Sequence, residues 1–243
     1  MTKHTMADFD LGSHVFLVST SSNEAQRFFD LGLNWCFGFN QEEGLACFKA
    51  AAALDPACAM LQWGIAYAAG PFYNMPWCDF SEVEATECTA FCRGHIDQAL
   101  ALSDGATALE AALIRALAQR IQKPQPVSQA EFDAWDDAYA DAMRKVNRDF
   151  PGDQDVMALF VEAMMTRNPW DLRDVKKGCP TEGADTLEAI GLCEQAIILA
   201  DRLGEAQHPA ILHLHIHLLE MSPEPEKAMD SADRLGGLCP DAG

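Results

Sequence analysis

Apolar residues recur every three or four positions along most of this chain, which is the spacing of one face of an α-helix. Residues 129–149 show the pattern clearly, with Phe132, Trp135, Tyr139, Met143 and Val146. Groups of Pro, Gly, Ser and Asp stand between such runs and begin or end helices. No segment has a strand pattern of any strength. The pattern therefore predicts an all-α fold of eight or nine helices joined by short loops.

The groups of Pro, Gly, Ser and Asp between the apolar runs set the expected bounds of these helices. Helices are predicted over 82–102, 129–149, 185–203 and 226–238, and another from His208-Pro209 to about residue 221. Ser22 or Asn23 is expected to cap the first helix, and Ser103 or Asp104 a later one. Residues 1–22 form a lead-in segment without periodicity, and 23–243 form the helical domain. The longest irregular stretch, 168–183, suggests a functional or packing insertion.

The stretch 27–56 has the spacing of one repeat and resembles the tetratricopeptide template. Its template positions are occupied by Phe28, Leu31, Gly32, Trp35, Gly44, Phe48, Ala51 and Pro56. Gly32 and Gly44 would let two antiparallel helices approach closely, and Pro56 would end the second helix. We expect an α-solenoid of antiparallel helix pairs. No polar capping helix follows Gly243, so we expect either a homo-oligomer through that end or a longer array.

Charge and cysteine usage narrow the class of protein. Seventeen basic residues stand against 37 acidic ones, a formal charge of −20, which disfavours nucleic acid and anionic membranes as partners. The first ten residues have no apolar core of a signal peptide, and no stretch reaches 18 uninterrupted apolar residues. The nine cysteines contain no Cys-x-x-Cys motif. An odd number of cysteines on helical patterns favours buried thiols in a reducing compartment, and hence a cytoplasmic location.

Four of the seven histidines fall between residues 208 and 217. His213, His217 and Glu220 are spaced i, i+4, i+7, so a helix would place them within roughly 60° of arc on one face, with His215 on the other. Two imidazoles and a carboxylate can bind Zn, Fe or Cu and leave positions open for water or substrate. The alternative is that these histidines lie between helices and hydrogen-bond to carbonyls or to Glu220.

A second set, Cys88, Cys92 and His95, has the same spacing and donor types that bind zinc. Two small cysteines on an amphipathic helix are more simply explained as core residues. The chain has no phosphate-binding loop and no Gly-x-Gly-x-x-Gly, Gly-x-Ser-x-Gly or His-Glu-x-x-His motif. The sequence therefore names no catalytic residue.

Three blocks make the chain similar to bacterial-type tetratricopeptide-repeat proteins over residues 23–243. They are a turn at 39–44, a Trp-Gly to Gly-Pro segment at 63–74, and the histidine block at 208–222. Gln41, Phe72 and Ala210 depart from the family pattern, in which a His, an Asn and a Gly stand there. The family's chain continues into a further histidine-containing helix, so a metal site completed there would be partial here. The resemblance implies the fold and no established reaction.

Two functions remain open from the sequence. One is an interaction module whose concave face binds a protein or peptide, which the repeat pattern and the absence of a complete catalytic motif favour. The other is a metal-binding protein or metal-dependent enzyme with His213, His217 and Glu220 as ligands. In that case the aromatic loop 72–77 would wall the pocket.

Overall fold

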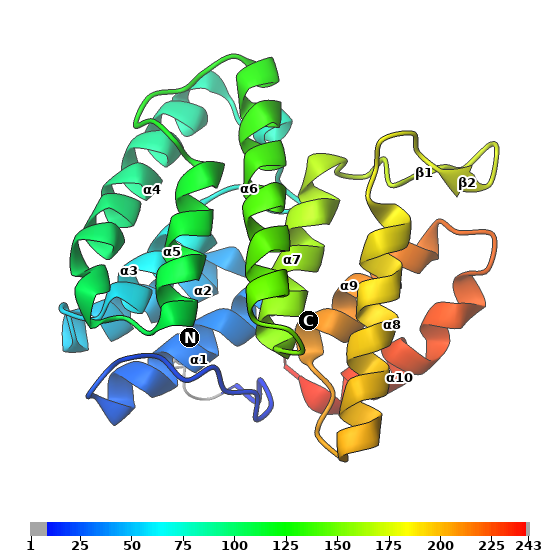
Figure 1. The fold of residues 1–243 in the computed structure, drawn as a ribbon, viewed down its shortest axis with the longest axis horizontal. Coiled ribbons are helices and arrows are strands. Elements are labelled where there is room, and N and C mark those ends of the chain that lie inside the picture. The colour runs from blue at the N-terminus through cyan, green and yellow to red at the C-terminus, as the bar shows by residue number, and fades with distance from the viewer. Residues whose placement is uncertain (1–8, 242–243) are drawn as a thin grey trace, which may run out of the picture.

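The protein, described here by a computed structural model covering residues 9–241, is built almost entirely of helices (Figure 1). The predicted all-α class is thereby confirmed for the described residues. Residues 1–8 of the expected lead-in segment and 242–243 of the expected domain lie outside them. The α-helices are α1 (Asn23–Phe37), α2 (Gln41–Leu54), α3 (Ala59–Ala69), α4 (Glu82–Leu102), α5 (Ala108–Arg120), α6 (Gln129–Asp149), α7 (Gln154–Arg167), α8 (Thr186–Leu203), α9 (Pro209–Glu220) and α10 (Met229–Leu238).

Most helix bounds follow the sequence pattern. Ser22 caps α1 by accepting a hydrogen bond from the backbone N–H of Ala25, as expected. The expected cap of α5 is wrong: residues 103–105 form a short 3₁₀ turn, and Thr107 caps the helix instead. Thr107 is favoured as the cap because Glu110 completes a capping box with it. The last helix is also shorter than expected, since residues 225–228 form a 3₁₀ turn before α10.

The irregular stretch after α7 contains the strands of the described chain. β1 (Arg173–Asp174) and β2 (Cys179–Pro180) pair antiparallel, with Arg173 opposite Pro180. No strand was expected, because two-residue strands are too short to show an alternating pattern. This hairpin lies at the upper right edge of Figure 1, beside the end of α7.

Each helix packs against the next along the chain, and α9 also contacts α1 and α7. In Figure 1, α1–α6 occupy the left part and α8–α10 the right, with α7 between them. The first helices approach closely because glycines stand at their contacts. A Cβ on Gly32 would lie 2.9 Å from the Phe48 ring, and one on Gly64 would lie 2.5 Å from it. The expected role of Gly32 in close packing is confirmed.

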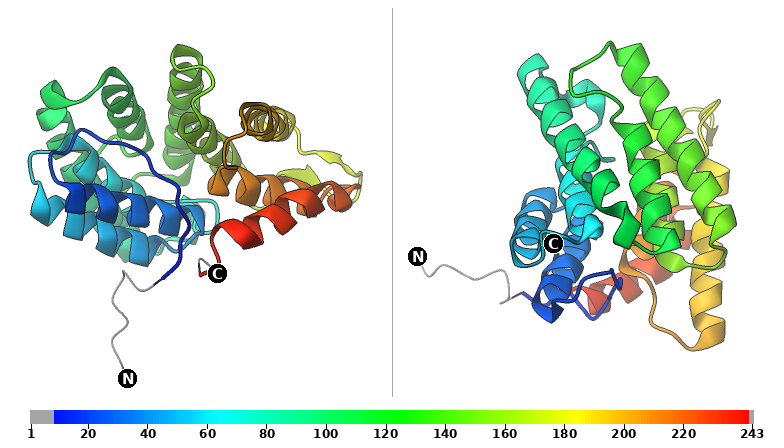
Figure 2. Two further views of the ribbon diagram at one scale, coloured as in Figure 1. Left: turned by 90° about the horizontal axis from the view of Figure 1, so that it is seen from below. Right: turned by 60° about the vertical axis from the view of Figure 1, so that its left-hand side comes forward.

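Residues 9–22 do not stand apart from the helical body. This leading segment, dark blue in Figure 2, runs along α1 towards the C-terminal end of the described chain. Ser19 donates from its backbone N–H and its hydroxyl to the buried carboxylate of Glu110, at 2.6 and 2.5 Å. The Sγ of Cys239 lies 3.2 Å from the carbonyl oxygen of Leu11. The segment thus contacts both the middle and the end of the chain.

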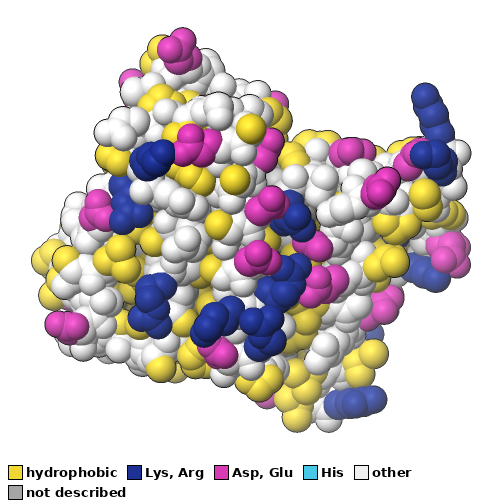
Figure 3. Space-filling model, turned by 45° about the horizontal axis from the view of Figure 1, so that its top comes forward, with side chains coloured by type: hydrophobic (Ala, Val, Ile, Leu, Met, Phe, Trp, Pro, Cys, Tyr) yellow, Lys and Arg dark blue, Asp and Glu magenta, His cyan; other side chains and the backbone are white. Residues whose placement is uncertain are grey.

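Surface charge is mixed where basic residues occur. On the face shown in Figure 3, Lys and Arg side chains lie beside Asp and Glu side chains. Arg144, for example, forms ion pairs with Asp141, Asp185 and Glu188. Such partly exposed pairs contribute little to stability individually.

Candidate functional sites

The helix α9 brings together two of the three residues that the sequence predicted as metal ligands. Pro209 occupies its first turn, where a missing backbone N–H costs nothing. The Nε2 atoms of His213 and His217 lie 3.1 Å apart. Glu220 does not join them directly: its Oε1 lies 2.8 Å from Nδ1 of His217, on the other side of that ring. We call His213 and His217 the histidine pair.

The other ring nitrogens of the pair reveal where the hydrogens are. Nδ1 of His213 lies 2.6 Å from the carbonyl oxygen of Phe37, which can only accept a hydrogen bond. Nδ1 of His217 faces the Glu220 carboxylate, which when ionised can also only accept. Each Nδ1 therefore carries a hydrogen. It follows that, without a cation between them, both Nε2 atoms present lone pairs to each other.

Two facing lone pairs require a cation between or beside them, which is either a proton or a metal ion. Burial lowers the pKa of His213, more than its hydrogen bond to Phe37 raises it, and so disfavours a proton there. Two nitrogens bound to one metal ion at about 2.1 Å, with an angle of about 90–110° at the metal, stand about 3.0–3.4 Å apart. The observed 3.1 Å lies in that interval.

The pair opens onto a cavity of about 380 Å³ between α1 and α9. Side chains from separate parts of the sequence line it, among them Asn34, Asn40 and Asn74. Asn40 belongs to the turn after α1, and Asn74 to the loop after α3. All three sequence blocks that carried the family resemblance therefore meet at this cavity.

Aromatic rings surround His217. The ring of Phe39 stacks on it, with centroids 5.3 Å apart, and Tyr73 and Trp170 lie at 5.7 and 6.4 Å. Phe39 and Trp170 are the non-glycine residues of the described chain with positive φ, at 61° and 59°. Bulky residues rarely adopt this left-handed conformation, and such strain concentrates at functional sites.

The expected aromatic wall is therefore right only in part. Tyr73 and Asn74 of the loop 72–77 lie at the site, but Trp77 stacks on Phe132 of α6 instead, with ring centroids 4.2 Å apart. Phe39 and Trp170 were not predicted, because positive φ at an aromatic residue leaves no mark in the sequence. His215 points away from the pair, as expected, and its Nδ1 lies 2.8 Å from the hydroxyl of Ser231.

The second predicted set does not assemble. The sulfur atoms of Cys88 and Cys92 lie 3.9 Å apart in the core, but Nδ1 of His95 lies 2.8 Å from Oε1 of Gln62. The hydrogen bond with Cys88, together with burial, raises the pKa of Cys92 well above its usual value, so this thiol stays protonated. These are the properties of core cysteines.

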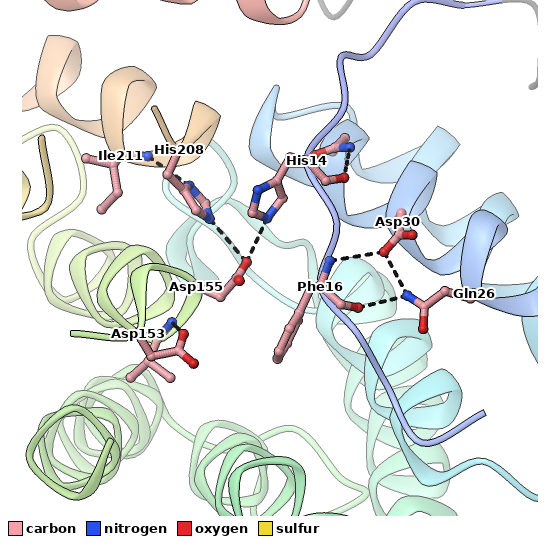
Figure 4. Close-up of polar contacts among 10 residues, drawn as sticks. His14, Phe16, Gln26, Asp30, Asp153, Asp155, His208 and Ile211 are labelled. Carbon is pink, nitrogen blue, oxygen red and sulfur yellow. Dashed lines mark hydrogen bonds and ion pairs between the residues drawn. The ribbon is translucent and has the colours of Figure 1, made fainter. Parts of the chain in front are cut away.

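A second cluster, absent from the sequence prediction, joins three distant segments (Figure 4). Oδ1 of Asp155 lies 2.8 Å from Nε2 of His14 and 3.1 Å from Nε2 of His208. The three ligand atoms all lie within 4.8 Å of one another, so this group could hold a metal ion. We call it the His-Asp-His cluster. His14 comes from the leading segment, where no helical pattern connected it to α7 or α9.

The hydrogens of this cluster are arranged differently. Burial lowers the pKa of His208 and favours the neutral ring, whose Nδ1 accepts a long 3.4 Å hydrogen bond from the backbone N–H of Ile211. Nε2 of His208 therefore donates to Asp155. Burial alone would raise the pKa of Asp155, but the hydrogen bonds from His14 and His208 outweigh it and hold that pKa well below its usual range. The cluster is satisfied without a metal.

Comparisons with known proteins give no family. No family model and no curated protein matches this chain. None of the helices in the described part of the chain is long and apolar enough to cross a membrane. The case for function therefore depends on the geometry of the two sites.

Proposed function

We propose that this protein binds a divalent transition metal ion at His213 and His217. The observation that carries the proposal is the 3.1 Å separation of two Nε2 atoms whose hydrogens are fixed on the opposite side of each ring. Metal-bound histidines typically donate their other N–H to a carbonyl or a carboxylate, which fixes the ring and raises its basicity. Phe37 and Glu220 supply these two acceptors. Glu220 thus supports a ligand and is not one itself.

Imidazole nitrogen suits Zn, Fe, Cu and Ni. Two protein ligands leave further positions of the ion to water or to a small molecule in the cavity. A metal ion held there would act as a Lewis acid on an oxygen of that molecule. The residues of this chain would contribute aromatic rings around the ion and the amide of Asn74 as a hydrogen-bonding group for a ligand.

The scaffold that holds this site we take to be a tetratricopeptide-like solenoid. Its support is the close packing of Gly32 and Gly64 on Phe48 and of Gly44 on Cys36, since the repeat template uses small residues for close packing. A Cβ on Gly44 would lie 2.9 Å from the carbonyl oxygen of Gly32. The packing of each helix against the next also fits a repeat array.

The metal proposal is tested by metal content. Mass spectrometry on untagged protein should find near-stoichiometric transition metal, and the His213→Ala/His217→Ala variant should lose the metal that is held at the histidine pair. His95→Gln is the matched control, because it removes a half-buried histidine outside both clusters. Equal metal in the wild type and the double variant, or no zinc uptake at micromolar concentration by metal-free wild type, would overturn the proposal.

A second candidate function is binding of a protein or peptide partner. An apolar cavity of about 560 Å³ lies beside the site, walled by Phe39, Leu45, Phe72, Met75 and Phe80. Glu42 and Glu43 also line it, so the chemistry suits an apolar side chain next to a basic one. Peptides selected from a random library should show that pattern and lose affinity on Glu42→Gln/Glu43→Gln. Selection of no peptide, or of peptides indifferent to this variant, would argue against it.

A further inference from the structure

The His-Asp-His cluster lies outside the proposed site and has a donor set of its own. We propose that His14, Asp155 and His208 form a second site for a divalent transition metal, which fastens the leading segment to the helical body. The donors come from the leading segment, from the first turn of α7 and from the N-cap of α9. Two histidines and one carboxylate are a donor set that holds such ions while leaving other positions open.

The distances are close to those of a bound set. Asp155 Oδ1 already lies 2.8 and 3.1 Å from the two nitrogens, and ligands that share one ion stand about 3 Å apart. The imidazole rings of His14 and His208 are in contact, with centroids 4.3 Å apart. A small outward shift of His14, which is more exposed than His208, would make room for the ion.

The surroundings supply the charge that a cation needs. The cluster opens onto a cavity of about 300 Å³ whose lining includes Asp153 and Glu205 besides Asp155, and which among the described residues contains no Lys or Arg. The N-termini of α7 and α9 disfavour a cation here, and these carboxylates offset that effect.

Binding would require each Nε2 hydrogen to leave or to move to Nδ1. In the metal-free protein each Nε2 donates to Asp155, so neither nitrogen can bind a metal in that form. At His208 a move to Nδ1 gives up the long hydrogen bond from Ile211. We therefore expect the cluster to bind metal more weakly than the histidine pair, whose hydrogens are already in place.

Metal binding would hold the leading segment more firmly against the helical body. Near His14, hydrogen bonds connect this segment to the helical body, such as those from the backbone N–H of Phe16 to Asp30 and from Ser19 to Glu110. A metal ion on His14 would add bonds from this segment to both α7 and α9. We expect zinc to slow amide exchange over residues 12–20.

The test starts from metal-free, full-length His213→Ala/His217→Ala protein, which lacks the histidine pair. Calorimetric titration with zinc should show one remaining site, and adding Asp155→Asn should weaken it at least tenfold. Asn keeps the size of Asp and an acceptor oxygen, but removes the charge. Adding His208→Asn should act likewise while preserving the N-cap, since Asn is a preferred cap residue. Adding His95→Gln should leave the titration unchanged.

Amide exchange provides the readout specific to the leading segment. Zinc should slow exchange over residues 12–20 in the double variant and have no such effect once His14→Ala is added. Absence of a zinc site in the double variant, or zinc binding indifferent to both Asp155→Asn and His208→Asn, would overturn the inference. Neither result bears on the histidine pair, which is judged by comparing the wild type with the double variant.

Discussion

The two histidine clusters of this protein have similar distances but opposite arrangements of hydrogen. In the histidine pair, the two Nδ1 atoms face oxygens that only accept, so two lone pairs meet at 3.1 Å. In the His-Asp-His cluster, the Nε2 hydrogens of His14 and His208 point at a carboxylate that accepts both. The first arrangement can offer two lone pairs to a cation, whereas in the second each Nε2 hydrogen already has an acceptor.

This difference shows that the distances between donor atoms are a weaker guide to a metal site than the hydrogen-bond partners of those atoms. Three ligand atoms within 4.8 Å of one another favour the His-Asp-His cluster as the metal site. The partners of the remaining nitrogens favour the pair, because they decide which ring atom has a lone pair to offer. The strained aromatic residues at His217 point to the pair as well.

The largest effect should separate the two clusters in the metal-free protein. His208→Ala removes a helix cap and a hydrogen bond to the partly buried Asp155, and leaves a cavity, so we expect it to cost about 2–4 kcal/mol of unfolding free energy. His213→Ala also loses a hydrogen bond but relieves the contact between lone pairs, and should cost about 1 kcal/mol or less. Urea denaturation in the presence of chelator measures both.

His208→Asn is the control for this comparison, because it keeps a capping side chain and should recover about 1 kcal/mol of the loss. Equal costs for His208→Ala and His213→Ala would mean that the hydrogens are not arranged as inferred. The distinction between a satisfied and an unsatisfied cluster would then fail.

The next effect concerns affinity and not stability. Glu220→Gln should weaken zinc binding at the pair by about 10–100-fold, because the carboxylate that orients His217 and raises its basicity is lost. Zinc titration of metal-free protein measures the change. Glu226→Gln, which neutralises an exposed carboxylate in the turn before α10, should leave the affinity unaltered. An undiminished affinity in Glu220→Gln would show that Glu220 does not act through His217.

The helices themselves were largely predictable from the sequence. Periodicity and capping residues gave α4 and α6 with the observed bounds, because each has a Ser cap and an unbroken helical pattern. The cap of α5 was misplaced since several polar residues competed, and only the capping box of Thr107 and Glu110 decides between them. The two-residue strands depend on tertiary context and could not have been predicted.

The sequence predicted contacts in the candidate sites only between residues that lie close together along the chain. His213 and His217 lie one turn apart, so helical spacing alone predicted that they meet. Glu220 lies beside His217 as the spacing predicted, but spacing does not say whether a carboxylate faces Nε2 or Nδ1. The union of His14 with Asp155 and His208 spans almost 200 residues, and no local pattern links them. Only the path of the leading segment places His14 there.

The smallest effect tests how firmly the leading segment is held beside the His-Asp-His cluster. Asp30 accepts hydrogen bonds from the backbone of Phe16 and from Gln26, and burial outweighs them to raise its pKa to about 6. A raised carboxyl pKa means that the folded state binds more protons than the unfolded state between about pH 4 and 6, so stability falls as the pH rises through that window.

Asp30→Asn removes this dependence and keeps the acceptor oxygen. We expect the metal-free variant to be more stable than the wild type by about 1 kcal/mol at pH 7.5, a value reduced because the carboxyl is partly exposed. At pH 4 the two proteins should differ little, since Asp30 is then largely protonated. Urea denaturation at both pH values measures the difference. A variant that is less stable than the wild type at pH 7.5 would mean that the Asp30 charge stabilises the leading segment. This segment would then depend on the Asp30 carboxylate near Phe16 as well as on the Asp155 carboxylate near His14.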